Sequence, residues 1–221
     1  MSSIQTNYKN LSSEVKSINP DAKICVVTKT QSVEKILEAI EAGAKIIGEN
    51  RIQEAEAKFP SIPSSVKKHL IGHLQRNKAK KAVELFDVIE SVDSLRLAKK
   101  INEECEKIGK IMQIMLEVNT SGEEQKYGFL PEEVLEKMKE ISQLKNLRII
   151  GLMTVAKYEE NSENCRGSFR KLKELFDEIK VLNLKNVEMK YLSMGMTNDY
   201  KIALEEGSNL IRVGTGVFGK R

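Results

Sequence analysis

Residues Tyr191 to Gly219 read YLSMGMTNDYKIALEEGSNLIRVGTGVFG, and their pattern decides the fold that we expect for the whole chain. The stretch begins in an apolar run, 187–192, continues through a segment of helical periodicity, 198–206, and reaches a second apolar run at Leu210. A strand, a helix and a second strand in this order form the repeating unit of a parallel sheet. The stretch therefore predicts an α/β protein.

The same unit recurs along the rest of the 221 residues. Eight short apolar runs alternate with helical stretches, and eight parallel strands are the number that closes into a (β/α)8, or TIM, barrel. A doubly wound open sheet is the alternative. The expected strands are 23–29, 45–48, 69–72, 88–92, 111–119, 147–153, 187–192 and a run at Leu210, and the expected helices are 33–42, one from Arg51, 78–85, 95–108, 131–142, 164–182 and 198–206.

An extra amphipathic helix is expected ahead of the first strand, over residues 2–18. Its apolar positions fall at helical spacing, and Asn19-Pro20 ends it. Almost no chain follows the eighth strand, so we expect this helix to pack on the barrel where an eighth helix would lie. We therefore expect a single domain over residues 1–221.

Arg212 is an unusual residue for the strand at Leu210, because that strand is otherwise apolar. Side chains alternate along a strand, so Arg212 is expected to point to the same side as Leu210 and Gly214. A charge in such a place normally has a partner. The partner is either an anionic ligand or a set of backbone carbonyl groups, and the segment alone leaves both open.

The run Gly214-Thr215-Gly216 directly follows this strand. It offers backbone N–H groups without bulky side chains and one hydroxyl, which suits an oxyanion such as phosphate. Ser193, at the end of the preceding strand, offers a second hydroxyl. We interpret these residues as two sides of one phosphate cradle, with an ordinary glycine turn as the alternative.

Lys29 ends the first expected strand and alternates with Cys25 and Val27, so we expect it inside the barrel. A desolvated lysine near Arg212 loses its proton more readily, and a neutral amine condenses with carbonyl compounds to form a Schiff base. The alternative is a strand-end lysine that reaches water. An amine, a phosphate cradle and a polar group facing a ring nitrogen are together what pyridoxal phosphate (PLP) requires.

Composition excludes several other classes of function. A net charge of +4 with 31% charged residues is too weak an imbalance to indicate nucleic acid binding. The sequence has no apolar run of about 18 residues and no signal-peptide core, so we expect a cytoplasmic protein that does not bind membranes. The basic run 75–81 is interpreted as a solvated helix face.

Metal binding is not expected from the pattern of histidines and cysteines. His69 and His73 are four residues apart but lack the glutamate of HExxH, and they lie on a strand and its end rather than on a helix. Cys25, Cys105 and Cys165 have no CxxC spacing, which indicates reduced thiols rather than disulfides or a thiolate metal site.

Six motifs, in this order and over nearly the whole chain, resemble those of the pyridoxal phosphate homeostasis protein family. A departure from the family pattern is Lys68, where an aromatic residue usually precedes the histidine. The motifs are Val27-Thr-Lys29, Ile47-Gly-Glu-Asn-Arg-Ile-Gln-Glu54, His69-Leu-Ile-Gly-His-Leu-Gln-Arg-Asn-Lys78, Gly151-Leu-Met-Thr154, Leu192-Ser-Met-Gly-Met-Thr-Asn-Asp199 and Arg212-Val-Gly-Thr-Gly-Val-Phe-Gly219.

The resemblance implies the barrel fold of the alanine racemase N-terminal domain and a role for particular residues toward PLP. The lysine matching Lys29 carries the cofactor as a Schiff base. Residues matching Ser193, Gly214 and Thr215 hold its phosphate, the one matching Arg212 faces the pyridine nitrogen, and the one matching Asn50 lies beside the ring.

The expected function is to carry and regulate PLP without catalytic turnover. An arginine has only donors and keeps its proton, so Arg212 disfavours a protonated pyridine nitrogen and weakens the cofactor as an electron sink. We also expect a monomer without the second domain of racemases, with apo PLP-dependent enzymes as recipients. Lys126, in a loop that resembles a family Ser-Lys-x-Gly motif, is a candidate transient acceptor. A small PLP-dependent amino-acid racemase is the alternative.

Overall fold

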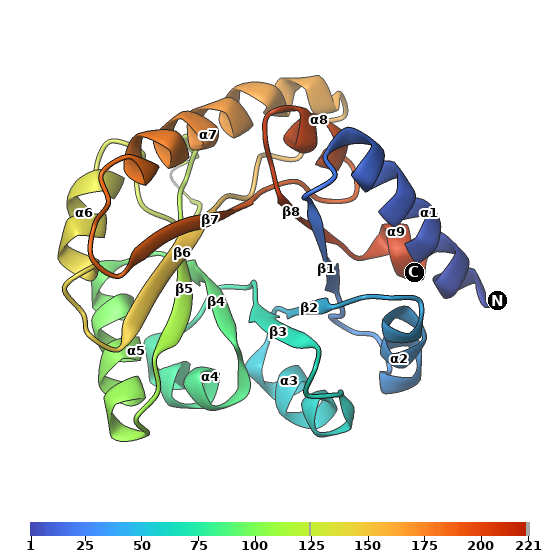
Figure 1. Cartoon of the computed structure of the whole chain (residues 1–221), viewed down its shortest axis with the longest axis horizontal. Helices are drawn as coiled ribbons and strands as arrows, with labels where there is room; N and C mark the ends of the chain where they lie inside the picture. The colour runs from blue at the N-terminus through green and yellow to red at the C-terminus, as the bar shows by residue number, and fades with distance from the viewer. Residues whose placement is uncertain (124, 220–221) are drawn as a thin grey trace.

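Eight parallel strands form a closed barrel in the computed structural model, which describes residues 1–123 and 125–219. Each strand pairs with its neighbour in sequence, and β8 pairs with β1 to close the ring, as Figure 1 shows. The closed ring confirms the predicted barrel and rules out the open sheet. The strands are β1 (Lys23–Val27), β2 (Ile46–Glu49), β3 (Lys67–Leu70), β4 (Val88–Val92), β5 (Met112–Glu117), β6 (Leu147–Met153), β7 (Val187–Ser193) and β8 (Leu210–Val213).

Helices lie around the outside of this ring (Figure 1). They are α1 (Ser3–Ile18), α2 (Val33–Glu41), α3 (Ile52–Lys58), α4 (Ala79–Leu85), α5 (Leu95–Lys107), α6 (Val134–Ile141), α7 (Arg166–Lys180), α8 (Tyr200–Glu205) and α9 (Thr215–Phe218), with short 3-10 helices η1 (Phe59–Ser61), η2 (Arg76–Lys78) and η3 (Ser162–Cys165). The helix α9 was not predicted from the sequence. Among the described residues, no helix is both long and apolar enough to cross a membrane.

The extra helix α1 covers the seam where β8 meets β1, as predicted. It packs against α2, α8 and α9, and its Tyr8 and Val15 belong to the same buried cluster as Ile24 of β1 and Ile211 of β8. Ser2 begins the helix with a capping box, because its hydroxyl accepts from the third residue of the helix, whose side chain accepts in return. Glu124, Lys220 and Arg221 of the predicted domain lie outside the described residues.

The interior of the barrel is apolar at one level and charged at the next. A buried cluster joins strand residues that point inward: Cys25, Ile46, Val88, Met115, Ile150, Met153 and Leu210. Arg212 lies beside Cys25 in the β1–β8 register, two residues after Leu210, and so points into the same interior nearer the carboxyl ends of the strands. Loops at that end of a (β/α)8 barrel carry its chemistry.

Gly151 marks an irregularity where β6 meets β7. The pairing register shifts between Ile149 and Gly151, and the glycine adopts a φ of +156°. A Cβ atom at this position would lie 1.8 Å from the backbone oxygen of Tyr191 on β7. The two strands can approach this closely only because residue 151 has no side chain.

Candidate functional site

Four of the residues expected to bind the cofactor line one pocket at the carboxyl ends of β8 and β1. Lys29, Arg212, Gly214 and Thr215 enclose a hollow of about 170 Å³. They come together because β8 and β1 are paired neighbours in the closed ring, so that their following loops share one edge. The loop after β7 also lines this pocket, through Met196 and Thr197.

Lys29 lies in a turn beyond β1 and is exposed, so the expectation of a desolvated lysine on the strand is wrong. The strand ends at Val27, and the amide of Thr28 makes a last bond to the carbonyl of Gly48, at 2.9 Å. Thr30 then adopts a φ of +62°, and the chain turns outward. Lys29 therefore reaches the pocket from its rim rather than from the barrel interior.

Arg212 anchors a chain of hydrogen bonds inside the barrel. Its side chain is 4% exposed, and its Nη2 donates to the backbone oxygen of Thr154 at 2.7 Å. Its Nη1 donates to Ser193 Oγ at 2.6 Å, and that hydroxyl donates to Glu90 Oε2, also at 2.6 Å. The other oxygen of Glu90 lies 2.6 Å from His69 Nδ1. The guanidinium is thus held in one orientation from two sides.

Glu90 supplies the negative charge that a buried arginine requires. Burial opposes ionisation of this carboxyl, but the hydrogen bond from His69, the charge of Arg212 and the bond from Ser193 together hold its pKa below the usual value. The alternative of backbone carbonyls is therefore partly right, because one bond goes to the carbonyl of Thr154. The other bond leads through the Ser193 hydroxyl to the carboxylate of Glu90, a partner that neither alternative included. Glu90 was not identified from the sequence, because nothing local marks it as the partner of a residue 122 positions away.

The structure does not bring Ser193 to the lining of the pocket. Its side chain is fully buried, and its hydroxyl is already used by Arg212 and Glu90. The hydroxyl that does face Thr215 belongs to Thr197, whose Oγ1 accepts from Thr215 Oγ1 at 3.0 Å. Gly195, with a φ of +94°, turns the chain between Ser193 and Thr197, and only Thr197 lines the pocket.

Asn50 follows β2 and lines a separate hollow at the same end of the barrel. Its Oδ1 is buried, and no hydrogen-bond partner occurs for it among the described residues. A Cβ atom on Gly72 would lie 2.5 Å from the backbone oxygen of Asn50, so the two loops pack tightly and hold the residue in place. A buried amide oxygen without a partner is a feature that a ligand can satisfy, and the position of Asn50 beside a cofactor ring stays a prediction.

The two histidines and Lys126, also considered from the sequence, lie in different places and have different partners. His73 stacks on the ring of Tyr127 at 3.7 Å and pairs with Asp93 at 2.9 Å, whereas His69 lies inside the barrel. The structure therefore gives the two histidines different partners. Lys126 pairs with Glu123 at 2.5 Å and does not line the pocket, so its role as an acceptor remains a prediction.

Two further titratable groups lie near Arg212. Burial raises the pKa of Glu117 to about 7, with a contribution from Asp93 and an opposing one from Arg212. Burial also raises the pKa of Cys25 well above its usual value. Its sulfur lies within 4.8 Å of ligand atoms of His69 and Glu90, and all three side chains are buried.

The groups around the pocket fit a small phosphorylated carbonyl compound. A primary amine, a guanidinium and two hydroxyls lie around one hollow. The amides of Thr215 and Gly216 open α9 and have no acceptor within the helix. A Cβ atom on Gly216 would come within 2.8 Å of Val213, so a small residue is needed for this turn.

The chain is similar to known proteins over nearly its whole length. The family model of the alanine racemase N-terminal domain matches residues 1–221. The pyridoxal phosphate homeostasis protein of Aquifex aeolicus is 39% identical over 201 residues, which are 90% of this chain and 87% of that protein. An unknown protein from Bifidobacterium adolescentis matches with a TM-score of 0.92 and 32% identity, over 98% of this chain and 94% of its own. PipY of Synechococcus elongatus with PLP bound matches with a TM-score of 0.86 and 33% identity, over 96% and 100% of the two chains.

Proposed function

This chain belongs to the pyridoxal phosphate homeostasis protein family, which has the fold of the alanine racemase N-terminal domain, and we propose from this that it binds PLP and keeps the cofactor available inside the cell. The observation that carries the proposal is that Lys29, Arg212, Gly214 and Thr215 line one pocket. PipY, which is similar over nearly its whole length, has been solved with PLP bound. These two facts support a cofactor site at the carboxyl ends of β8 and β1.

Each side of the pocket has a separate part in the proposed binding. The amine of Lys29 forms the covalent bond to the cofactor aldehyde, with loss of water. The amides and hydroxyls after β8, together with Thr197, bind the phosphate. Arg212 faces the pyridine nitrogen, and Asn50 lies at the edge of the ring. Ser193 affects PLP binding indirectly: its hydroxyl orients Arg212 and does not contact the cofactor.

Arg212 makes the site one that holds the cofactor and does not use it. Bound PLP supplies an electron sink that is strong only when its ring nitrogen is protonated. Arg212 has no acceptor atom and keeps its own proton, and its bonds to Ser193 and Thr154 prevent it from turning away. We therefore propose a carrier without significant turnover, which acts as a cytoplasmic monomer and delivers PLP to apo enzymes.

The carrier proposal predicts transfer without catalysis. Protein loaded with PLP is mixed with an apo PLP-dependent enzyme and a scavenger for free PLP. The rate at which the enzyme becomes active should exceed the rate at which the loaded protein releases PLP into solution when no apo enzyme is present. Assays for racemase, transaminase and decarboxylase activity on the common amino acids should detect negligible turnover. A kcat within the ordinary enzyme range of about 1 to 10³ s⁻¹ for any of them would favour a small racemase or related enzyme instead.

Thr215→Ala and Thr197→Ala are each expected to weaken PLP binding by about ten- to a hundredfold. The reason is the loss of a hydrogen bond to a charged phosphate, worth about 1.5 to 3 kcal/mol. Pyridoxal, which lacks the phosphate, should bind these variants and the wild type equally. Equilibrium dialysis with the two ligands measures both effects.

Ser193→Ala serves as the matched control for that comparison. Its hydroxyl contacts Arg212 and Glu90, so its loss should weaken PLP and pyridoxal binding by the same factor. A loss confined to PLP in Ser193→Ala, with no such loss in Thr197→Ala, would return Ser193 to the phosphate cradle and remove Thr197 from it.

A further inference from the structure

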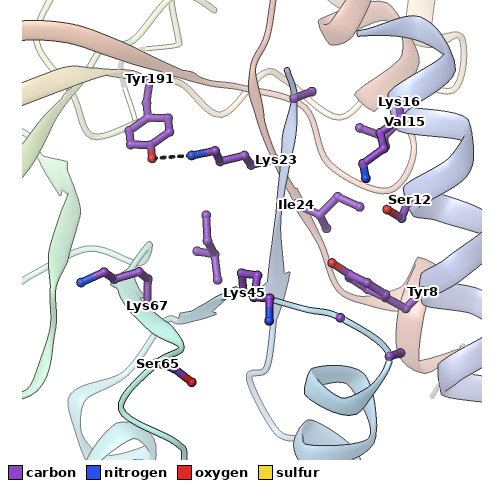
Figure 2. A pocket seen from close by; sticks show the side chains of 14 residues that line it. Tyr8, Ser12, Val15, Lys16, Lys23, Ile24, Lys45, Ser65, Lys67 and Tyr191 are labelled. Atoms are coloured by element: carbon purple, nitrogen blue, oxygen red, sulfur yellow. Dashed lines mark hydrogen bonds between the residues drawn. The ribbon is translucent and has the colours of Figure 1, made fainter. Parts of the chain in front are cut away.

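A second hollow lies at the opposite end of the barrel from the proposed PLP site. Its volume is about 610 Å³, against about 170 Å³ for the pocket that contains Lys29, and the two share no lining residue. It lies at the amino ends of β1, β2 and β3 and extends under α1, as Figure 2 shows. We refer to it as the amino-end hollow. Nothing in the proposed PLP function requires it.

Lysines line this hollow without any acidic side chain among its lining residues. Lys23 is the first residue of β1, Lys45 directly precedes β2, and Lys67 is the first residue of β3, so a lysine lies at the start of each of three neighbouring strands, at the same rim. The amide of Lys67 donates to the backbone oxygen of Lys45 at 2.9 Å, which fixes the two side by side. Lys16 of α1 is the fourth lysine that lines the amino-end hollow.

These ammonium groups are poorly neutralised by the protein itself. Within the described part of the chain, the ion pair that involves one of the four lysines joins Lys67 to Asp87 at 3.6 Å, with the Lys67 side chain 63% and the Asp87 side chain 39% exposed. A paired charge that exposed is worth little. The four lysines lie on both sides of β1 around one hollow (Figure 2), and its lining contains no acidic side chain. A hollow lined by one sign of charge attracts an anionic ligand.

The walls of the hollow also provide neutral groups suited to a ring and to hydroxyls. Lys23 Nζ donates to the hydroxyl of Tyr191 at 3.1 Å, and Figure 2 shows the two side chains pointing toward each other. Tyr8 and Ser12 of α1 lie on the far side of β1, with Ile24 facing them (Figure 2). The site thus combines several cationic donors with aromatic and apolar surface. A volume of about 300 to 1,000 Å³ is typical for small-molecule sites.

We propose that the amino-end hollow binds a small molecule that carries at least two phosphate groups and an aromatic ring system, which is the chemistry of a nucleoside diphosphate. Lysine ammonium groups bind phosphate as point charges, and the rings and apolar side chains contact the base. A single phosphate would leave most of the lysines without a counter-charge, so a diphosphate fits better than a second molecule of PLP.

Isothermal titration of the full-length protein with ADP and with inorganic pyrophosphate tests this site. Both probes should bind the wild type, ADP more tightly because it adds contacts of the base. The double variant Lys23→Gln, Lys67→Gln should weaken each by about tenfold or more, and added salt should weaken them further. The matched control is Lys80→Gln, Lys171→Gln, which removes the same charge from exposed positions elsewhere and should bind both probes as the wild type does.

Two further titrations separate this inference from the proposed PLP function. ADP should bind Lys29→Ala as tightly as it binds the wild type, and a loss there would mean that ADP occupies the PLP pocket and would overturn the inference. PLP should not compete with ADP. The inference also fails if neither probe binds at about 1 mM, if both double variants lose affinity equally, or if PLP binds the amino-end hollow and ADP does not.

Discussion

Replacing Lys29 with alanine is expected to abolish covalent attachment of PLP while leaving the protein folded. Lys29 is exposed on a turn and lines the pocket with Arg212 and Thr215. In the proposed site it reacts with the cofactor aldehyde, while Thr215 binds the phosphate and Arg212 faces the pyridine nitrogen. Its removal opens no buried volume, and the free energy of unfolding should change by less than about 0.5 kcal/mol. Borohydride reduction followed by peptide mass spectrometry detects the attached cofactor.

Lys78→Ala is the matched control for this variant. Lys78 lies at the same end of the barrel and lines the hollow that contains Asn50. Its replacement should leave the amount of attached PLP unchanged. Label found on Lys78, or on Lys126, in the reduced wild-type protein would show that another amine carries the cofactor, and the assignment of Lys29 would then be wrong.

Gly151→Ala is expected to destabilise the barrel by about 4 kcal/mol or more. The added Cβ atom would meet the backbone oxygen of Tyr191 at 1.8 Å, and backbone atoms cannot rotate away as a side chain can. The strands β6 and β7 would have to separate, and the φ of +156° would add strain. Urea denaturation measures the loss.

Gly167→Ala makes the same chemical change as Gly151→Ala but is expected to stabilise the protein. Gly167 lies within α7, and a Cβ atom there would have no neighbour within 4 Å. Alanine at this position in the first turn of the helix should therefore stabilise the protein by about 0.4 to 1 kcal/mol. If Gly151→Ala unfolds at the same urea concentration as the wild type, the close approach of β6 and β7 does not exist in solution.

The sequence was sufficient to predict the barrel because its signals are local. Each apolar run is followed by a helical period, and the extra helix over residues 2–18 has its own apolar stripe. The ends of the strands were less predictable. The first strand was extended to Lys29, whereas it ends at Val27, because the turn depends on Thr30 adopting a positive φ without a glycine to signal it.

The site was only partly predictable because half of it depends on contacts between distant residues. Arg212, Gly214 and Thr215 fall within one stretch of four residues, so their pattern could be interpreted locally as an anion site, with an ordinary glycine turn as the alternative. The choice between Ser193 and Thr197 depends instead on how the chain turns at Gly195, and both hydroxyls look equivalent in the sequence. Glu90 belongs to β4, and only closure of the barrel brings it to Ser193.

The pairing of β8 with β1 has a consequence for the order of events during synthesis. Lys29 is made early, whereas Arg212 and Thr215 leave the ribosome nearly 200 residues later. Until β8 has been made and has joined β1, the amine and the phosphate-binding turn are not parts of one structure. In the proposed site, a nascent chain therefore exposes Lys29 without the means to retain PLP, and the capacity to retain the cofactor arises when β8 pairs with β1 and completes the ring.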